Sequence, residues 1–164
     1  MVRKKWIDGN TNHIRYSLHN KIRRMKKYEF TGEVKVVFGI TLHRIRAAVS
    51  FGVVVKGELG GWIEKEKNLS QNGDAWVCDN AMVYGNAMVY GDAIVCGNAD
   101  YIVFKNWWSS GRYFTWTRSN NKWRVGCFFG TGAELIAKAY KDSEQSGREY
   151  ERAVKYVESI LNEQ

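Results

Sequence analysis

The sequence has little cysteine and histidine and no long hydrophobic run, and each shortage argues against a class of protein. Cys78, Cys96 and Cys127 are the three cysteines among 164 residues, and no CxxC pair occurs. Their odd number favours reduced thiols over a disulfide scaffold, and no nearby histidine completes a metal site. No apolar stretch reaches the roughly 18 residues of a membrane span, and the basic N-terminus lacks a signal peptide's apolar segment. We expect a cytoplasmic protein with no membrane association, metal or cofactor.

Catalytic signatures are also missing from the chain. It has no phosphate-binding loop, no HExxH motif and no recognisable carboxylate pair. The three histidines, His13, His19 and His43, all precede the repeat described below, whereas acyltransferases built on such repeats use a histidine base between subunits. Cys127 lies in an aromatic segment without a basic partner that the sequence can name. We therefore expect no catalytic residue, and a hexapeptide-type acyltransferase is the leading enzymatic alternative.

Positive charge is concentrated at the start of the chain. Residues 1–30 hold nine Lys or Arg and two Asp or Glu, which leaves a balance of only +1 for residues 31–164. A basic arm of this kind can contact phosphates or an acidic protein surface; the alternatives are a solvated tail or an upstream extension before a start at Met25. Its candidate binding residues are Arg3, Lys4, Lys5, Lys21, Arg23, Arg24, Lys26 and Lys27.

A six-residue repeat occupies residues 72–101. Ala recurs at positions 75, 81, 87, 93 and 99, and Val recurs at 77, 83, 89 and 95. A period of six fits neither a helix nor a plain strand, and the two residues before each Ala, Gly or Asp and then Asn or Asp, favour tight corners. The pattern predicts a short parallel β-helix with three hexads per coil, and it resembles the left-handed hexapeptide-repeat class. One coil would be 18 residues, so Trp76 should lie near Ile94 and Cys78 near Cys96.

The alternation of the repeat predicts which side chains face outward. If Ala and Val point inward, an apolar row points away from the coil, and contiguous exposed apolar patches of this kind are uncommon on monomers. This row is covered by the flanking parts of the chain, or it forms an interface with further copies in a dimer or trimer or with another protein. Its candidate interface residues are Trp76, Met82, Tyr84, Met88, Tyr90 and Ile94.

The flanking segments predict caps for the short coil. Residues 26–70 have strand-like composition punctuated by glycines. Residues 102–164 predict a β-hairpin turning at positions 119–121 and two helices, with capping boxes at Thr131–Glu134 and Ser146–Glu149. The expected architecture is mainly β with an α+β tail: a basic extension (1–25), a β cap (26–70), the β-helix (71–101) and a hairpin-plus-two-helix domain (102–164).

Aromatic and basic residues also gather near the predicted hairpin. Base stacking on aromatic rings beside cations is a common way to bind nucleotides. This aromatic-basic cluster is a second candidate binding site, although its members can equally form the core of the hairpin. It consists of Trp107, Trp108, Arg112 and Trp116.

Two stretches of the sequence carry a resemblance to a known group. GELGGWIEKEKNLS (57–70) and GCFFGT (126–131), with VYGNA-type hexads between them, resemble a recurrent family of phage and prophage proteins that place variable numbers of hexapeptide repeats between similar ends. The resemblance covers residues 25–164 and implies a phage origin inside a bacterial host cell. It supplies no established activity.

These observations together favour a non-enzymatic binding protein. By analogy with phage accessory proteins, we expect an inhibitor of a host defence system that occludes a nuclease or nucleic-acid complex or sequesters an anionic nucleotide. The partners would be a second copy of the chain and a host defence protein or its nucleic acid or nucleotide. A structural component of virion assembly is the alternative from a different class.

Overall fold

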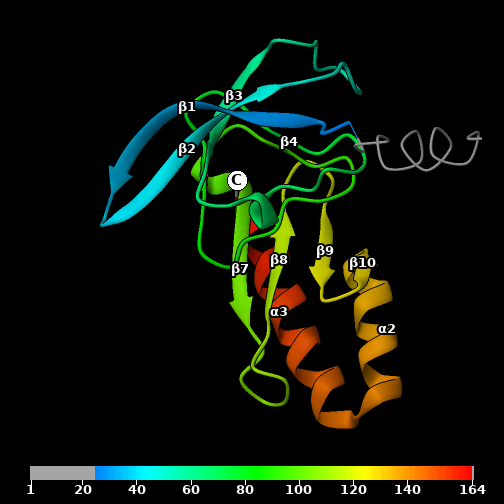
Figure 1. Ribbon diagram of the computed structural model, residues 1–164. Coiled ribbons are helices and arrows are strands. Elements are labelled where there is room, and N and C mark those ends of the chain that lie inside the picture. The colour runs from blue at the N-terminus through cyan, green and yellow to red at the C-terminus, as the bar shows by residue number, and fades with distance from the viewer. Residues whose placement is uncertain (1–24, 164) are drawn as a thin grey trace, which may run out of the picture.

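The computed structural model describes residues 25–163. Figure 1 shows a mixed α+β fold, which contains three β-sheets and two α-helices within those residues. The prediction of a parallel β-helix for residues 71–101 is wrong, because the described residues form no closed or solenoid sheet. The repeat therefore belongs to a different architecture from the one that the hexads predict.

The N-terminal sheet has the order β1-β2-β3-β5. Strands β1 (Tyr28–Val37) and β2 (Ile40–Ala47) form an antiparallel hairpin, whose outer part extends away from the rest of the molecule in Figure 1. Phe38 and Gly39 make its two-residue turn with φ angles of 52° and 77°, as a type I′ turn requires. Strand β3 (Leu59–Ile63) pairs antiparallel with β2. A short 3-10 helix, η1 (Glu66–Asn68), follows β3.

The hexads form strands of only two residues, β4 (Trp76–Val77), β5 (Met82–Val83) and β6 (Ile94–Val95). The Ala and Val residues of the four hexads in 72–95 are at most 1% exposed, which confirms their inward direction. Trp76 pairs in parallel with Ile94, as the 18-residue spacing predicts. However, β5 pairs with β3 of the N-terminal sheet, while β4 and β6 form a separate two-stranded sheet. The short strands are thus divided between two sheets instead of stacking into one wall.

Two glycines allow β3 to lie against the repeat. A Cβ on Gly60 would lie 2.6 Å from the Trp76 ring and 2.7 Å from the Val77 carbonyl oxygen. A Cβ on Gly61 would lie 2.7 Å from the carbonyl oxygen of Ala81. Such distances are shorter than side chains tolerate, so the Gly60–Gly61 pair explains how the cap and the repeat share one core. Trp76 was expected to face outward, but it is 2% exposed, because Phe51 and β3 cover it.

The C-terminal part contains a second sheet and a helix pair. Its strands are β7 (Tyr101–Lys105), β8 (Tyr113–Thr117), β9 (Lys122–Val125) and β10 (Phe128–Gly130), in antiparallel order β10-β9-β8-β7. A 3-10 helix, η2 (Asn98–Asp100), precedes β7. Strands β8 and β9 form the hairpin predicted around positions 119–121. The helices are α2 (Gly132–Asp142) and α3 (Glu144–Asn162).

The helix starts agree in part with the predicted capping boxes. Thr131 caps α2 as predicted: its hydroxyl oxygen accepts from the Glu134 N–H, and the Glu134 carboxylate accepts from the Thr131 N–H. Helix α3 begins earlier than predicted, because Ser143 rather than Ser146 is its N-cap and accepts from the Ser146 N–H. One face of α3 packs into the C-terminal core, since Tyr150, Val154 and Val157 are buried.

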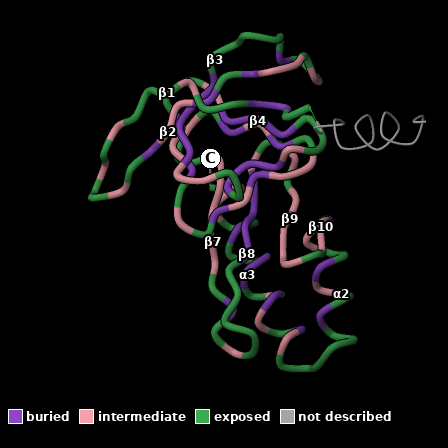
Figure 2. Tube along the Cα trace, viewed as in Figure 1, coloured by how far each residue is buried: buried purple, intermediate pink, exposed green. Residues whose placement is uncertain are grey.

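The described residues form two hydrophobic cores (Figure 2). One core joins the N-terminal sheet to the repeat, so residues 26–70 and 71–101 pack together. The other lies between strands β8 and β9 and helices α2 and α3, and includes Phe114, Trp116 and Trp123. The Thr115 hydroxyl accepts from the Met88 N–H, and the Ser119 hydroxyl accepts from the Ile94 N–H. These hydrogen bonds connect the repeat to the second sheet.

The expectation of three reduced thiols is wrong for one pair. Cys78 and Cys96 form a disulfide with their Cα atoms 4.6 Å apart, because the 18-residue spacing places them side by side. Cys127 is free and exposed. Within residues 25–163, only Cys78, Asp79 and Cys96 bring three possible metal-ligating atoms close together. Since both sulfur atoms are in the disulfide, these residues do not form a metal site.

Candidate functional site

The basic arm is described only at its end. Arg3, Lys4, Lys5, Lys21, Arg23 and Arg24 lie outside the described residues. Lys26 is exposed and forms an ion pair with Glu66. Lys27 is 4% exposed, and its Nζ donates to the Ala75 carbonyl oxygen at 2.6 Å and to the Gly73 carbonyl oxygen at 3.3 Å. Lys27 therefore presents no free ammonium group to a phosphate; it holds the repeat against β1.

The aromatic-basic cluster is not one surface. Trp107 is 69% exposed, whereas Trp116 is 1% exposed and donates through Nε1 to the Asn121 side chain at 2.8 Å. Trp108 is half-buried against Phe114 and Tyr150. Arg112 is exposed. The structure thus places Trp116 in the C-terminal core and leaves Arg112 as the cluster member that lines a pocket.

The candidate interface residues of the repeat are largely covered by the chain itself. Tyr84 is 36% exposed, and Met82, Met88, Tyr90 and Ile94 are half-buried. The guanidinium of Arg124 lies 4.2 Å from the centre of the Tyr90 ring. The hydroxyl of Tyr101 donates to the Met82 carbonyl oxygen at 2.8 Å. Strands β7 to β9 therefore occupy much of the face that was expected to meet a second copy.

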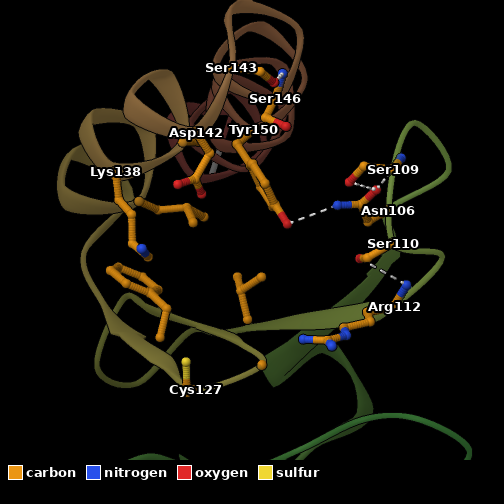
Figure 3. Close-up of a pocket in the computed structure, with 15 residues that line it drawn as sticks. Asn106, Ser109, Ser110, Arg112, Cys127, Lys138, Asp142, Ser143, Ser146 and Tyr150 are labelled. Atoms are coloured by element: carbon orange, nitrogen blue, oxygen red, sulfur yellow. Dashed lines mark hydrogen bonds between the residues drawn. The ribbon is translucent and has the colours of Figure 1, made fainter.

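A pocket of about 470 Å³ opens between the second sheet and the helix pair (Figure 3). Four segments meet there: the β7–β8 loop, the β9–β10 turn, α2 and the first turns of α3. Its volume is within the range typical of small-molecule sites. Val125, Phe128 and Leu135 give it apolar walls, and its polar lining residues are Asn106, Ser109, Ser110, Arg112, Cys127, Lys138, Asp142, Ser143, Ser146 and Tyr150.

Three charged side chains line this pocket. Arg112 lies across it from Lys138 and Asp142, which come from α2. Within residues 25–163, none of the three side chains forms an ion pair or a side-chain hydrogen bond. Two cations and one carboxylate thus remain available to a ligand in the same cavity.

The phenol of Tyr150 projects into the pocket and is held by Asn106. The Asn106 Nδ2 donates to the Tyr150 hydroxyl oxygen at 3.1 Å, and the Asn106 Oδ1 accepts from the backbone and hydroxyl of Ser109. Both Asn106 and Tyr150 are buried. In the described part of the chain, the phenol proton itself has no acceptor, so it can donate to a ligand.

Two charged residues of the pocket, Asp142 and Arg112, affect the pKa of the Tyr150 hydroxyl. Burial raises the pKa of Tyr150 above its ordinary value, and the hydrogen bond from Asn106 opposes this rise. The carboxylate of Asp142 raises the pKa further, whereas the cation of Arg112 lowers it. The phenol therefore stays protonated at neutral pH as a hydrogen-bond donor.

A second pocket of about 310 Å³ lies beside the first. Arg112 and Gly126 line both, so the two cavities meet at this arginine. The second pocket adds the ammonium of Lys67, the amide of Asn86 and the ring of Tyr113. Arg112 thus lies between the two pockets, with Lys138 and Asp142 lining the first and Lys67 lining the second.

Comparison with known proteins does not assign these pockets. No protein-family model matches the chain, and no curated protein matches it. Neither described α-helix combines the length and apolarity that crossing a membrane would require.

Sequence patterns identified only part of this site. Arg112 belonged to a predicted cluster, but Asn106, Lys138, Asp142 and Tyr150 did not. Asn106 and Tyr150 are 44 positions apart in the sequence. Lys138, Asp142 and Tyr150 occupy positions that are ordinary for the surface or the core side of an amphipathic helix. The sequence contains no local signal that brings these residues together. His43 lies elsewhere, with its ring centre 4.9 Å from that of Phe30 in the β1–β2 hairpin.

Proposed function

We propose that this chain is a non-enzymatic binding protein whose pocket between the second sheet and the helix pair holds a small anionic ligand. The observation that carries the proposal is that Arg112 and Lys138 line one pocket and pair with no carboxylate in the described part of the chain. Natural pockets of this size combine apolar walls with a few polar groups that set the ligand's orientation. Here the hydroxyls of Ser109, Ser110 and Tyr150 complete that arrangement.

The resemblance to phage and prophage proteins gives the proposal its setting. A phage-encoded protein that removes an anionic nucleotide from solution would inhibit a host defence system that signals with such a molecule. A pocket of small-molecule size favours this form over occlusion of a nuclease complex, because occluding a large partner needs a wide complementary surface. Much of the row that could supply such a surface on the repeat is covered by strands β7 to β9.

Calorimetric titration of the whole chain with inorganic pyrophosphate and with the four ribonucleoside monophosphates tests this proposal. We expect saturable binding that weakens about tenfold or more in Arg112→Gln and in Lys138→Gln, since each removes a charge-assisted hydrogen bond. Lys141→Gln is the matched control, because Lys141 is an exposed cation on the same helix outside the pocket. Binding that neither pocket variant weakens, or no binding of any of these anions, would contradict the proposal.

A further inference from the structure

Lys138 and Asp142 present a donor and an acceptor to the same cavity. They are four residues apart on α2, which corresponds to about one turn and a rise of roughly 6 Å. Both line the pocket, and Figure 3 shows the Asp142 carboxylate and the Lys138 ammonium directed toward its interior. Although their spacing suits an intrahelical ion pair, the described residues include no ion pair between them. The carboxylate and the ammonium are therefore both available to one ligand.

The other walls of the pocket suit a flat ring with a charged extension. Phe128, Val125 and Leu135 supply apolar surface on which an aromatic ring can lie. Arg112 lies on the opposite side from α2 and at the entrance to the second pocket. Beyond it, Lys67 provides another cation. A ligand that fits would have its ring at the α2 end and its negative charge at Arg112.

We infer that the pocket holds the base of a guanine nucleotide, with Asp142 accepting from the two adjacent N–H groups of the base. The Lys138 ammonium donates to the neighbouring ring carbonyl oxygen, and Arg112 binds the phosphate, which can extend toward Lys67. This assignment rests on the proposed function and names the ligand of the same site.

The hydrogen-bonding pattern distinguishes guanine from the other bases. Guanine carries a ring N–H, an amino group and a carbonyl oxygen along one edge, which is the order that a carboxylate beside an ammonium complements. Adenine has no carbonyl oxygen, and its amino group lies beside an acceptor nitrogen. Uracil has one ring N–H between two carbonyl oxygens, so one oxygen would face the Asp142 carboxylate. Cytosine likewise has an acceptor nitrogen beside its amino group.

Titration of the whole chain with GMP, IMP, XMP and AMP tests the inference. IMP lacks the amino group of GMP and should bind about tenfold more weakly, the cost of one charge-assisted hydrogen bond. XMP carries a carbonyl oxygen in place of that amino group, and it should bind the native chain weakest of the purine 6-oxo nucleotides. In Asp142→Asn, the amide can donate to this oxygen, so the preference should reverse from GMP to XMP.

The control and the contrary outcomes separate this inference from the proposed function. Glu158→Gln removes an exposed carboxylate of α3 that lies outside the pocket, and it should leave the GMP preference unchanged. If GMP and AMP bind equally and Asp142→Asn changes neither, the guanine assignment is overturned while anion binding at Arg112 and Lys138 stands. If no nucleotide binds, the guanine assignment is overturned as well, and pyrophosphate titration decides the proposed function alone.

Discussion

The side-chain amide of Asn106 donates to the phenol of Tyr150 across 3.1 Å, joining the β7–β8 loop to α3. Asn106 also accepts from both the backbone and the hydroxyl of Ser109. One buried amide thus holds the loop that carries Arg112 close to the helix pair. The shape of the pocket depends on this connection.

Asn106→Ala should lower the free energy of unfolding by about 1–3 kcal/mol. The substitution removes three hydrogen bonds and leaves a buried phenol without its partner. It should also weaken anion binding, because the loop bearing Arg112 loses its anchor. Urea denaturation measures the first effect and calorimetric titration with pyrophosphate the second. Gln145→Ala, on the exposed first turn of α3, is the control; equal stability of the two variants would exclude an anchoring role for Asn106.

Gly61→Ala should destabilise the chain by about 1–3 kcal/mol through overpacking. The added Cβ would lie 2.7 Å from the Ala81 carbonyl oxygen and 2.9 Å from the Cys78 carbonyl oxygen, and backbone atoms cannot move as freely as a side chain. Gly97→Ala is the matched control, since its Cβ would meet only Asp100 at an ordinary 3.7 Å. Urea midpoints that fall equally for both variants would show that β3 does not pack against the repeat in this way.

The disulfide between Cys78 and Cys96 should contribute about 3 kcal/mol to stability. It closes a loop with a sequence separation of 18, and the loss of loop entropy in the unfolded chain gives this magnitude. A reducing agent should lower the free energy of unfolding of the native chain but not that of the Cys78→Ser/Cys96→Ser variant. Cys127→Ser should keep the full response to reduction, because Cys127 is free and exposed. An unchanged native chain after complete reduction would contradict the prediction.

Lys27 should make stability rise with pH in the alkaline range. Burial lowers its pKa to about 8, while the carboxylate of Asp74 opposes this shift. Between pH 8 and the ordinary lysine pKa of about 10.4, the unfolded chain binds more protons than the folded chain, so stability increases with pH there. Below pH 8 the cost of burying the charge is fully present. With allowance for partial solvent screening, the gain should not exceed about 2 kcal/mol.

Urea denaturation between pH 7.5 and about pH 9.5 measures this effect, below the range in which tyrosines ionise. Tyr101, whose pKa burial raises to about 12, acts in the opposite direction only above pH 10. In Lys27→Met the rise with pH should become smaller; Lys35, whose pKa burial also lowers, acts in the same direction and remains. The variant should also lose stability overall, because the Ala75 and Gly73 carbonyl oxygens lose their donor. A pH dependence that is the same with and without Lys27 would exclude it as the cause.

The repeat shows how far a local pattern determines the fold. The direction of Ala75 and Val77 and the pairing of Trp76 with Ile94 follow from side-chain alternation and an 18-residue spacing, so the sequence could predict them. The partner of β5 could not be predicted in this way. Strands of two residues pair with whichever edge is available, and the small surface of Gly60 and Gly61 makes β3 that edge. The hexads therefore predict the local direction of the side chains but not the parallel β-helix.

The candidate site was less predictable than the fold. Arg112 stood out because it lies among aromatic residues, but Trp116 in the same cluster is a core residue. Lys138 and Asp142 have the composition of any solvent-facing helix surface, and only the packing of α2 against the second sheet gives them a shared cavity. Such non-local placement leaves no periodic signal in a single sequence.

The most direct test of this account is to titrate the ¹⁵N-labelled chain with GMP and record the backbone amide shifts. We predict saturable shifts confined to the pocket segments, around positions 106–112, 126–128 and 138–146, and the loss of these shifts in Arg112→Gln. Shifts concentrated instead on the repeat around positions 82–95, or no shift at any nucleotide concentration, would contradict the central claim that this pocket is the ligand site.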